Sequence, residues 1–306
     1  MILVVGSANM DLVVRTPRMP APGQTVLGSG FISSPGGKGA NQAVAAARLG
    51  GRCRFIGRVG DDSFGRSLLT NMKAEGVDCT DLMVTPGSPT GVAMIVVDAR
   101  GENAIVVDAG ANARLTPDDI FDRADVFEEA AVVVLQLELP LPTVRAAISV
   151  ARRCGCRIIL DPAPAINPMP DELLQVDIVS PNVVEAETIT GTKAIEERVD
   201  KHVASELIAR GASAAVLKLG SRGSLVVMAD GHFYRVPPYN VTVVDTTAAG
   251  DAFTAAFAVA IAAGQDYHQA AKFANAAGAL ACTRLGAQYA MPTRNEVRML
   301  IQDQPQ

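Results

Sequence analysis

Short runs of apolar and β-branched residues alternate along the chain with longer segments in which apolar residues recur every three or four positions. The short runs predict buried strands at residues 2–5, 54–56, 132–135, 157–160, 178–180 and 214–219. The longer segments predict helices at residues 40–49, 63–75, 143–154, 251–263 and 267–283. Because strands that alternate with helices favour right-handed crossovers, the pattern predicts an α/β fold with a three-layer α/β/α core around a mostly parallel sheet.

Two segments break this alternation. Residues 12–32 contain several Pro and Gly residues and have no helical period, and residues 91–108 hold two β-rich runs around a glycine turn at Gly101. We expect residues 12–35 and 90–109 to pair into a small β-sheet, a lid inserted in a single domain of residues 1–306. A lone small sheet exposes an apolar face, which suits it to covering a substrate, to pairing with another subunit, or to both.

The composition narrows the possible functions. A hydrophobic content of 49% with no tryptophan and 4% aromatic residues favours an aliphatic interior. The net charge of -5 gives no general attraction to nucleic acid or to a membrane, so neither is an expected partner. The 5 cysteines lack the paired spacing of a zinc site, and the N-terminus has no secretion signal, so we expect reduced thiols and a cytoplasmic location. The weakly polar residues 252–263 are too few to span a bilayer, which takes about 20, and predict a buried helix.

Common catalytic and phosphate-binding motifs are absent from the sequence. It contains no G-x-x-x-x-G-K-[ST] phosphate loop, no G-x-G-x-x-G, no H-E-x-x-H and no G-x-S-x-G. None of the 3 histidines lies in a recognisable motif. Any phosphate must therefore be held by a different local arrangement.

Residues 245–251, with the sequence Asp-Thr-Thr-Ala-Ala-Gly-Asp, offer such an arrangement. We expect a strand to end at Val244 and a helix to begin after the small residues, so that the backbone N–H groups of Ala248, Ala249, Gly250 and Asp251 form an anion hole. The helix dipole adds about half a positive charge there, and a carboxylate at Asp251 would reach a hydroxyl beside the phosphate. From these residues alone, Asp251 is equally an ordinary acid in a first helical turn, with alanines that simply pack.

This segment closely resembles the Asp-Thr-x-Ala-x-Gly-Asp signature of the ribokinase (PfkB-type) carbohydrate kinase family. A second signature of that family is matched by residues 36–50, which begin Gly-Gly-Lys-Gly-Ala-Asn-Gln. The resemblance covers essentially the whole chain, including residues 6–11 and 283–288. It implies a ribokinase-like fold and transfer of the γ-phosphoryl group of ATP to a sugar, with Asp251 as the general base.

The resemblance also implies a set of sugar-binding residues. By position they are Asn9, Asp11, Gly37, Lys38, Asn41 and Glu138, together with Asp251. Carboxylates and amides are suited to fixing adjacent hydroxyl groups of a neutral sugar. Without the resemblance, Asn9 and Asp11 would equally form a turn after the first strand, and Asn41 would be a helix-start residue.

The form of residues 36–42, with Asn9 and Asp11, favours D-ribose as the substrate and D-ribose 5-phosphate and ADP as the products. The alternatives are a related kinase that acts on deoxyribose, fructose, a ketodeoxy sugar acid or a nucleoside. A non-catalytic sugar-binding regulator that kept the fold is a further alternative, although the intact Gly250 and Asp251 argue against it.

The nucleotide side is implied by two further elements. Residues 182–185 fit an N-x-x-E capping box and resemble a family element that organises Mg²⁺ and phosphate. Residues 219–223 resemble the adenine-nucleotide turn of the family. The alternative interpretation of this segment is a loop between a strand and a hairpin at residues 224–236. The residues expected at the nucleotide are Asn182, Glu185, Lys218, Gly220, Ser221, Gly223 and Asn275. Asn275 is otherwise an amide on a helix surface, and Lys218 stands where the family commonly has a hydroxyl residue.

The resemblance further implies Mg²⁺ with ATP, K⁺ as an activator, and a homodimer that pairs through the lid. The positions that match the monovalent-cation site are Asp245, Thr247, Ala281, Arg284, Gly286 and Ala290. Most of these would bind through backbone oxygens, which leave no side-chain signature. Ala290 replaces a serine that is common at this position.

Overall fold

The computed structural model describes residues 1–193 and 196–305 of the chain. Within these residues, 9 strands form one sheet in the order β13-β12-β11-β10-β9-β8-β1-β4-β5. The strands are β1 (Ile2–Val5), β4 (Cys53–Gly60), β5 (Leu82–Thr85), β8 (Val132–Leu135), β9 (Arg157–Leu160), β10 (Ile178–Val179), β11 (Ala214–Lys218), β12 (Ser224–Met228) and β13 (Phe233–Val236). Pairing is parallel from β5 to β11, and the hairpin β12–β13 adds antiparallel strands at one edge.

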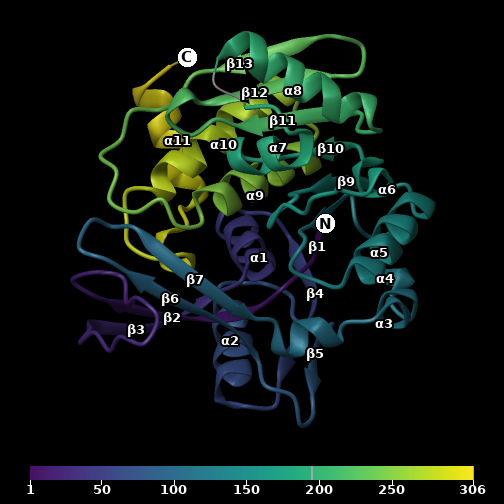
Figure 1. The fold of residues 1–306 in the computed structure, drawn as a ribbon. Helices are drawn as coiled ribbons and strands as arrows, with labels where there is room; N and C mark the ends of the chain where they lie inside the picture. The colour runs from purple at the N-terminus through teal and green to yellow at the C-terminus, as the bar shows by residue number, and fades with distance from the viewer. Residues whose placement is uncertain (194–195, 306) are drawn as a thin grey trace.

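Helices cover both faces of this sheet (Figure 1). One face carries α1 (Lys38–Arg48), α2 (Ser63–Ala74), α9 (Ala249–Ala262), α10 (Tyr267–Ala281) and α11 (Arg294–Asp303). The other carries α3 (Pro117–Phe121), α4 (Ala124–Glu128), α5 (Leu141–Arg153), α6 (Asp171–Leu174), α7 (Val183–Thr190) and α8 (Glu197–Ala209). Short 3₁₀ helices are η1 (Gly110–Arg114), η2 (Gly220–Arg222) and η3 (Gln288–Ala290). Along β1, Ile2 and Val4 pack into the first layer while Leu3 and Val5 pack into the second, which confirms the three-layer α/β/α core.

The two segments that break the alternation form a separate sheet of 4 strands within the described residues, in the order β3-β2-β6-β7. The strands are β2 (Asn9–Arg15), β3 (Ser29–Gly36), β6 (Gly91–Val97) and β7 (Asn103–Asp108). β6 and β7 form the expected antiparallel hairpin, and β2 joins the two segments by pairing parallel to β6. This small sheet lies beside α2, to one side of the core (Figure 1).

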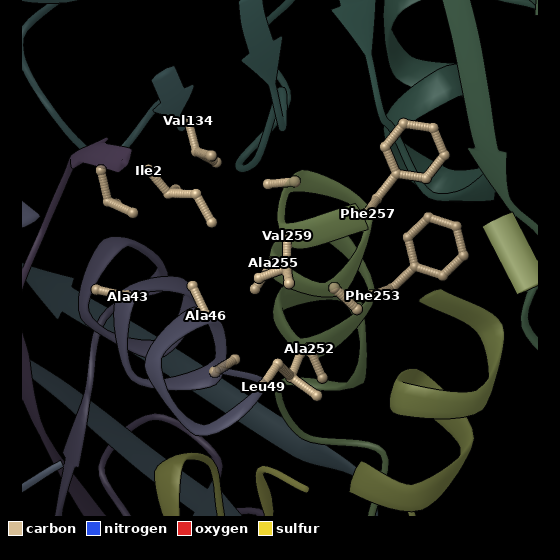
Figure 2. Close-up of a cluster of buried hydrophobic side chains, with 14 of the residues drawn as sticks. Ile2, Ala43, Ala46, Leu49, Val134, Ala252, Phe253, Ala255, Phe257 and Val259 are labelled. Carbon is tan, nitrogen blue, oxygen red and sulfur yellow. The ribbon is translucent and has the colours of Figure 1, made fainter. Parts of the chain in front are cut away.

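Helices α1 and α9 pack closely against each other beneath the large sheet (Figure 2). Their contact contains the small side chains of Ala43 and Ala46 on α1 and of Ala252 and Ala255 on α9, all of which are buried. Small residues let two helix backbones approach, because no bulky side chain separates them. The contact therefore fixes polar residues near the N-terminus of one helix against those of the other.

The apolar segment at residues 252–263 lies almost wholly in α9, and every residue from Asp251 to Ile261 is buried. The expectation of a buried helix is thus confirmed. Among the residues that the structure describes, no helix combines the length and the apolar character needed to cross a membrane.

The strand expected to end at Val244 is not formed. Residues 241–246 have no regular structure, and the side chains of Val243 and Val244 are 60% and 54% exposed. The β-branched residues predicted a strand, but β13 ends at Val236 and is followed by two prolines, which cannot donate to a sheet ladder. Instead, the N–H groups of Val244 and Asp245 both donate to the carbonyl oxygen of Cys282, at 2.8 and 3.2 Å.

Ala255→Leu should test the tightness of the contact between α1 and α9. The added atoms have no free space at this buried position, so the free energy of unfolding should fall by about 1 to 3 kcal/mol in urea. Ala263→Leu, at the exposed end of the same helix, is the control and should change it by less than about 0.5 kcal/mol. Equal stability of the two variants would contradict the close packing.

Candidate active site

Buried polar side chains gather at the carboxyl ends of the parallel strands. Gln136 directly follows β8, Asp161 directly follows β9, and Lys218 is the last residue of β11. The N-terminal halves of α1 and α9 bring further polar residues to the same edge, including Gln42 and Asp251. In open α/β sheets this edge is where ligands bind, so the large sheet and its helices place the candidate site here.

The carboxylate of Asp251 is held by two amide groups from α1. Asn41 Nδ2 donates to Asp251 Oδ2 at 2.9 Å, and Gln42 Nε2 donates to Asp251 Oδ1 at 3.1 Å. Gln42 Nε2 also donates to Asp161 Oδ2 at 2.9 Å, while Gln42 Oε1 accepts from Gln136 Nε2 at 2.6 Å. Because each of these groups is buried, the network fixes the orientation of Asp251.

Helix α9 begins with an unusual turn. Ala248, its N-cap residue, has a φ of 58°, a left-handed conformation that costs a residue with a Cβ about 1 kcal/mol. Within the described residues, the N–H groups of Ala248, Gly250 and Asp251 have no hydrogen-bond acceptor. The N–H of Ala249 was expected to join them, but it donates to the carbonyl oxygen of Thr246 at 3.3 Å because the turn folds back on itself. Fewer N–H groups than expected are therefore available to an anion at this turn.

The electrostatics at Asp251 favour a proton acceptor. Burial raises the pKa of Asp251, whereas the positive charge of Lys38 lowers it. The negative charge of Asp161 raises it further, so the pKa of Asp251 lies above its ordinary value. Burial alone would lower the pKa of Lys38, but the surrounding carboxylates, Asp251 first among them, raise it above its ordinary value. A carboxylate with a raised pKa next to a stable cation is suited to general-base catalysis.

Asn9 and Asp11 lie two residues apart on β2 and so share one face of the small sheet. Asn9 Oδ1 accepts from Asn112 Nδ2 at 2.7 Å. Asp11 faces other acids: its burial and the negative charges of Glu138 and Asp251 raise the pKa of Asp11 to about 7. A Cβ on Gly36 would lie 2.1 Å from Asp11 Oδ2, so only glycine fits beside this carboxylate. The alternative in which Asn9 and Asp11 form a turn is wrong, because both lie in β2.

Glu138 ties the glycine-rich segment to the end of β1. Its Oε2 accepts from Ser7 Oγ and from the backbone N–H of Lys38, the latter at 3.1 Å. A Cβ on Gly39 would lie 2.6 Å from the backbone of Gly6, so this crossing of two chain segments needs glycine. The predicted sugar-side residues Asn9, Asp11, Gly37, Lys38, Asn41 and Glu138 therefore lie near the N-terminus of α1, and charge interactions link Asp11 and Lys38 to Asp251.

A cavity of about 440 Å³ lies on the other side of Gly250. Its lining includes five of the predicted nucleotide residues, namely Lys218, Gly220, Ser221, Gly223 and Asn275. Asn275 is not a surface amide: it is buried, and its Nδ2 donates to the carbonyl oxygens of Val236 and Pro237 at 3.1 and 3.0 Å. It thereby anchors the segment that leads from β13 into the cavity wall at Pro238 and Tyr239.

Asn182 and Glu185 form the capping box expected at the start of α7. Asn182 Oδ1 accepts from the N–H of Glu185 at 2.8 Å, and Glu185 Oε2 accepts from the N–H of Asn182 at 2.7 Å. A β-bridge places Asn182 beside Lys218, although neither capping residue lines the cavity. Burial raises the pKa of Glu185, and the positive charge of Lys218 only partly opposes this.

Three of the six predicted cation-site residues contact one another. Asp245 Oδ1 accepts from the N–H and the hydroxyl of Thr247 at 2.9 and 2.6 Å, and Asp245 Oδ2 accepts from the N–H of Gly286 at 2.9 Å. Burial opposes ionisation, but these hydrogen bonds lower the pKa of Asp245. The other three residues are Ala281 at the end of α10, Arg284, whose guanidinium pairs with Glu296, and Ala290 in η3.

Comparison with known proteins shows the family of the chain. The profile of the pfkB family carbohydrate kinases matches residues 1–294. The chain belongs to the pfkB family of carbohydrate kinases. It is therefore a carbohydrate kinase, a phosphotransferase.

Relatives of this kinase align over almost its whole length. It is 41% identical over 301 residues to the ribokinase of Bacillus subtilis, covering 98% of this chain and 99% of the relative. It is 35% identical over 293 residues to the deoxyribokinase of Salmonella typhimurium, covering 95% of each. Its structure matches that of Arabidopsis thaliana ribokinase complexed with ribose and ATP with a TM-score of 0.91, at 33% identity and 98% coverage of each chain.

Several residues of this network were not singled out from the sequence of the kinase. Asp161 and Gln136 each directly follow a buried strand that the sequence did predict, and a polar residue at the carboxyl end of a parallel strand is a usable signal. Gln42 lay within the glycine-rich signature. Asn112 gave no such signal because it lies in a 3₁₀ turn. Thr254, whose hydroxyl donates to Asp161 Oδ2, gave none because it lies inside an apolar helix.

The raised pKa of Asp11 predicts a pH-dependent loss of stability. The folded chain keeps this carboxyl protonated up to about pH 7, whereas the unfolded chain releases the proton near pH 4, so Asp11 destabilises the fold increasingly from pH 4 to 7. Asp11→Asn should therefore be more stable than the unchanged protein by on the order of 2 kcal/mol at pH 8, with little difference at pH 4. Urea unfolding across this range measures it. Asp108→Asn on the exposed strand β7 is the control, and an equal gain there would refute the assignment.

Proposed function

We propose that this kinase transfers the γ-phosphoryl group of ATP to the 5-hydroxyl of D-ribose, with Asp251 as the general base. The observation that carries the proposal is the position of Asp251: its carboxylate is held by Asn41 and Gln42, in the same turn as the unpaired N–H of Gly250. Gly250 lines the cavity that would receive the nucleotide. The names of the Bacillus subtilis relative and of the Arabidopsis thaliana complex with ribose and ATP support ribose as the substrate.

In this reaction the hydroxyl oxygen of the sugar attacks the γ-phosphorus while its proton passes to Asp251. The bond from the γ-phosphorus to the bridging oxygen of ADP breaks in line with the attack. Negative charge on the transferring group is stabilised by the unpaired N–H groups of Gly250 and Asp251 and by the dipole of α9. A positioned base contributes about 10²- to 10⁴-fold to such a rate.

Mg²⁺ enters with ATP and, when bound, neutralises phosphate charge. Glu185 fits a contact to it through water, because both of its carboxylate oxygens already accept hydrogen bonds from Asn182. K⁺ fits the turn around Asp245 for a related reason: the side chain of Asp245 is occupied by Thr247 and Gly286, which leaves backbone oxygens as the available donors.

The small sheet acts as a lid over the sugar and as the surface for a homodimer. Asn9 and Asp11 link it to the sugar side of the site, so its movement would open or close that side. Support for pairing comes from its exposed apolar residues, which include Phe31, Ile32, Met94, Ile105, Val106 and Val107, and from the exposed Leu27 just before β3. Exposed apolar side chains in such number on one small sheet favour burial against a second copy.

Replacement of the proposed base should remove most of the activity. Asp251→Asn keeps the shape of the side chain but cannot accept the proton, so kcat should fall at least about 10²-fold with a modest change in the KM for the sugar. The measurement is ADP release in a coupled assay. Asp266→Asn is the matched control, because Asp266 is an exposed N-cap acid of α10 and should leave kcat unchanged. Near-normal turnover of Asp251→Asn would exclude it as the base.

The choice of sugar can be decided with the same assay and a panel of ribose, deoxyribose, fructose, a ketodeoxy sugar acid and a nucleoside. A site built around hydroxyl groups leaves polar groups unpaired when one hydroxyl is missing, so kcat/KM should be at least about tenfold higher for ribose than for deoxyribose. A higher value for deoxyribose would match the Salmonella typhimurium relative instead. With Mg²⁺ and K⁺ present, no ADP release with any sugar would indicate a non-catalytic sugar-binding regulator.

A further inference from the structure

Lys218 places a buried ammonium group at the boundary between the nucleotide cavity and the start of α9. It ends β11, is only 8% exposed, and lines the cavity. Its Nζ is the nearest atom to the place where a Cβ on Gly250 would lie, at 3.6 Å. The ammonium therefore lies beside the point at which a phosphate would approach the unpaired N–H of Gly250.

The ammonium group has one firm partner and one weak partner. Lys218 Nζ donates to Asp161 Oδ1 at 2.8 Å and to Thr254 Oγ1 at 3.4 Å. An ammonium has three N–H donors, so one remains for a ligand in the cavity. Asp161 in turn accepts from Thr254 Oγ1 at 3.2 Å and from Gln42 Nε2 at 2.9 Å.

These bonds connect Lys218 to the proposed base. The amide nitrogen of Gln42 donates to both Asp161 Oδ2 and Asp251 Oδ1, one hydrogen to each carboxylate. Three hydrogen bonds between buried groups thus set the separation of the ammonium of Lys218 from the carboxylate of Asp251. A substitution of Asp161 would therefore change the positions of both Lys218 and Gln42.

We propose that Lys218 is a catalytic residue whose ammonium contacts the γ-phosphoryl group of ATP, and that Asp161 and Gln42 are positioning residues that hold it at a fixed distance from Asp251. This inference rests on the phosphoryl transfer proposed above. Lys218 keeps its proton throughout: the proton of the sugar hydroxyl passes to Asp251, and the ammonium stabilises the charge that develops on the phosphoryl oxygens.

A buried ion pair offers a simpler account of Lys218. If it only neutralises Asp161, its removal leaves an uncompensated buried charge and damages the fold, so substitution of Lys218 alone cannot separate the two roles. Removal of both charges of the ion pair separates the two roles. The double variant Asp161→Asn/Lys218→Met roughly keeps the side-chain volumes and removes both members of the ion pair.

The first measurement is kcat with the best sugar, after urea unfolding has shown that the double variant is folded. We expect kcat to stay at least about 10²-fold below that of the unchanged protein, because a fixed electrostatic contact to the transferring group is lost. Recovery of normal kcat would overturn the inference. Lys73→Met, an exposed lysine on α2, is the control and should have normal kcat.

Asp161→Asn alone tests the positioning role. Since the negative charge of Asp161 raises the pKa of Asp251, its removal should move the acid limb of the kcat profile to lower pH while the KM for the sugar stays within about threefold. An acid limb at an unchanged pH would contradict the proposed connection to the base.

The second measurement needs no sugar. Binding of ADP and of AMP-PNP, a nonhydrolysable analogue of ATP, is compared by calorimetry in the double variant and the unchanged protein. A contact to the γ-phosphoryl group predicts a loss of at least about tenfold for AMP-PNP and less than about twofold for ADP. Equal losses for both nucleotides would overturn the inference. If no sugar supports ADP release, the proposed function fails, and this binding comparison still decides the role of Lys218.

Discussion

The close packing of α1 against α9 is the constraint on which the candidate site depends. Asn41 and Gln42 lie in the first turns of α1, and Asp251 lies in the first turn of α9, so their hydrogen bonds require the two helix starts to be adjacent. Buried alanines permit that approach, and Gly39 lets α1 begin against the end of β1. A buried hydrogen bond between an amide and a carboxylate offsets the cost of desolvating the two groups only if both stay in place. The packing of the helices and the hydrogen bonds between them therefore support each other.

The charges of the site are arranged around this contact in two groups. On the proposed sugar side, Asp11 lies near Glu138 and Asp251, and its burial, together with the negative charges of these two residues, keeps the pKa of Asp11 high. On the nucleotide side, Lys218 pairs with Asp161. Burial lowers the pKa of Lys38, but the negative charges of carboxylates in both groups raise it, so Lys38 keeps its proton. A phosphoryl group that enters between Lys218 and the start of α9 would thus meet positive charge, whereas a neutral sugar would meet hydrogen-bond acceptors.

The strands of the large sheet could be predicted from the sequence because buried parallel strands are continuous apolar runs; residues 132–135 and 157–160 were predicted without error. The segment at Val243 and Val244 has the same local character and forms no strand, because two prolines separate it from β13 and the N–H of Val244 donates to the carbonyl oxygen of Cys282 instead. The site was harder to predict. The role of Asp161 as the link between Lys218 and Gln42 depends on contacts across 119 and 57 residues of chain, and no local pattern encodes such distances.

The start of α9 explains why an energetically unfavourable turn is retained. Helices α2, α10 and α11 begin with side-chain caps from Asp62, Asp266 and Thr293, each of which accepts from the N–H of the third helical residue. Helix α9 has no side-chain cap and instead begins at Ala248 in a left-handed conformation. A side-chain cap would occupy an N–H group of the proposed anion hole, so the uncapped turn loses some stability but leaves that N–H group available to a phosphate. The hydrogen bonds from Val244 and Asp245 to Cys282, outside the turn, hold the preceding segment in place and compensate part of that loss.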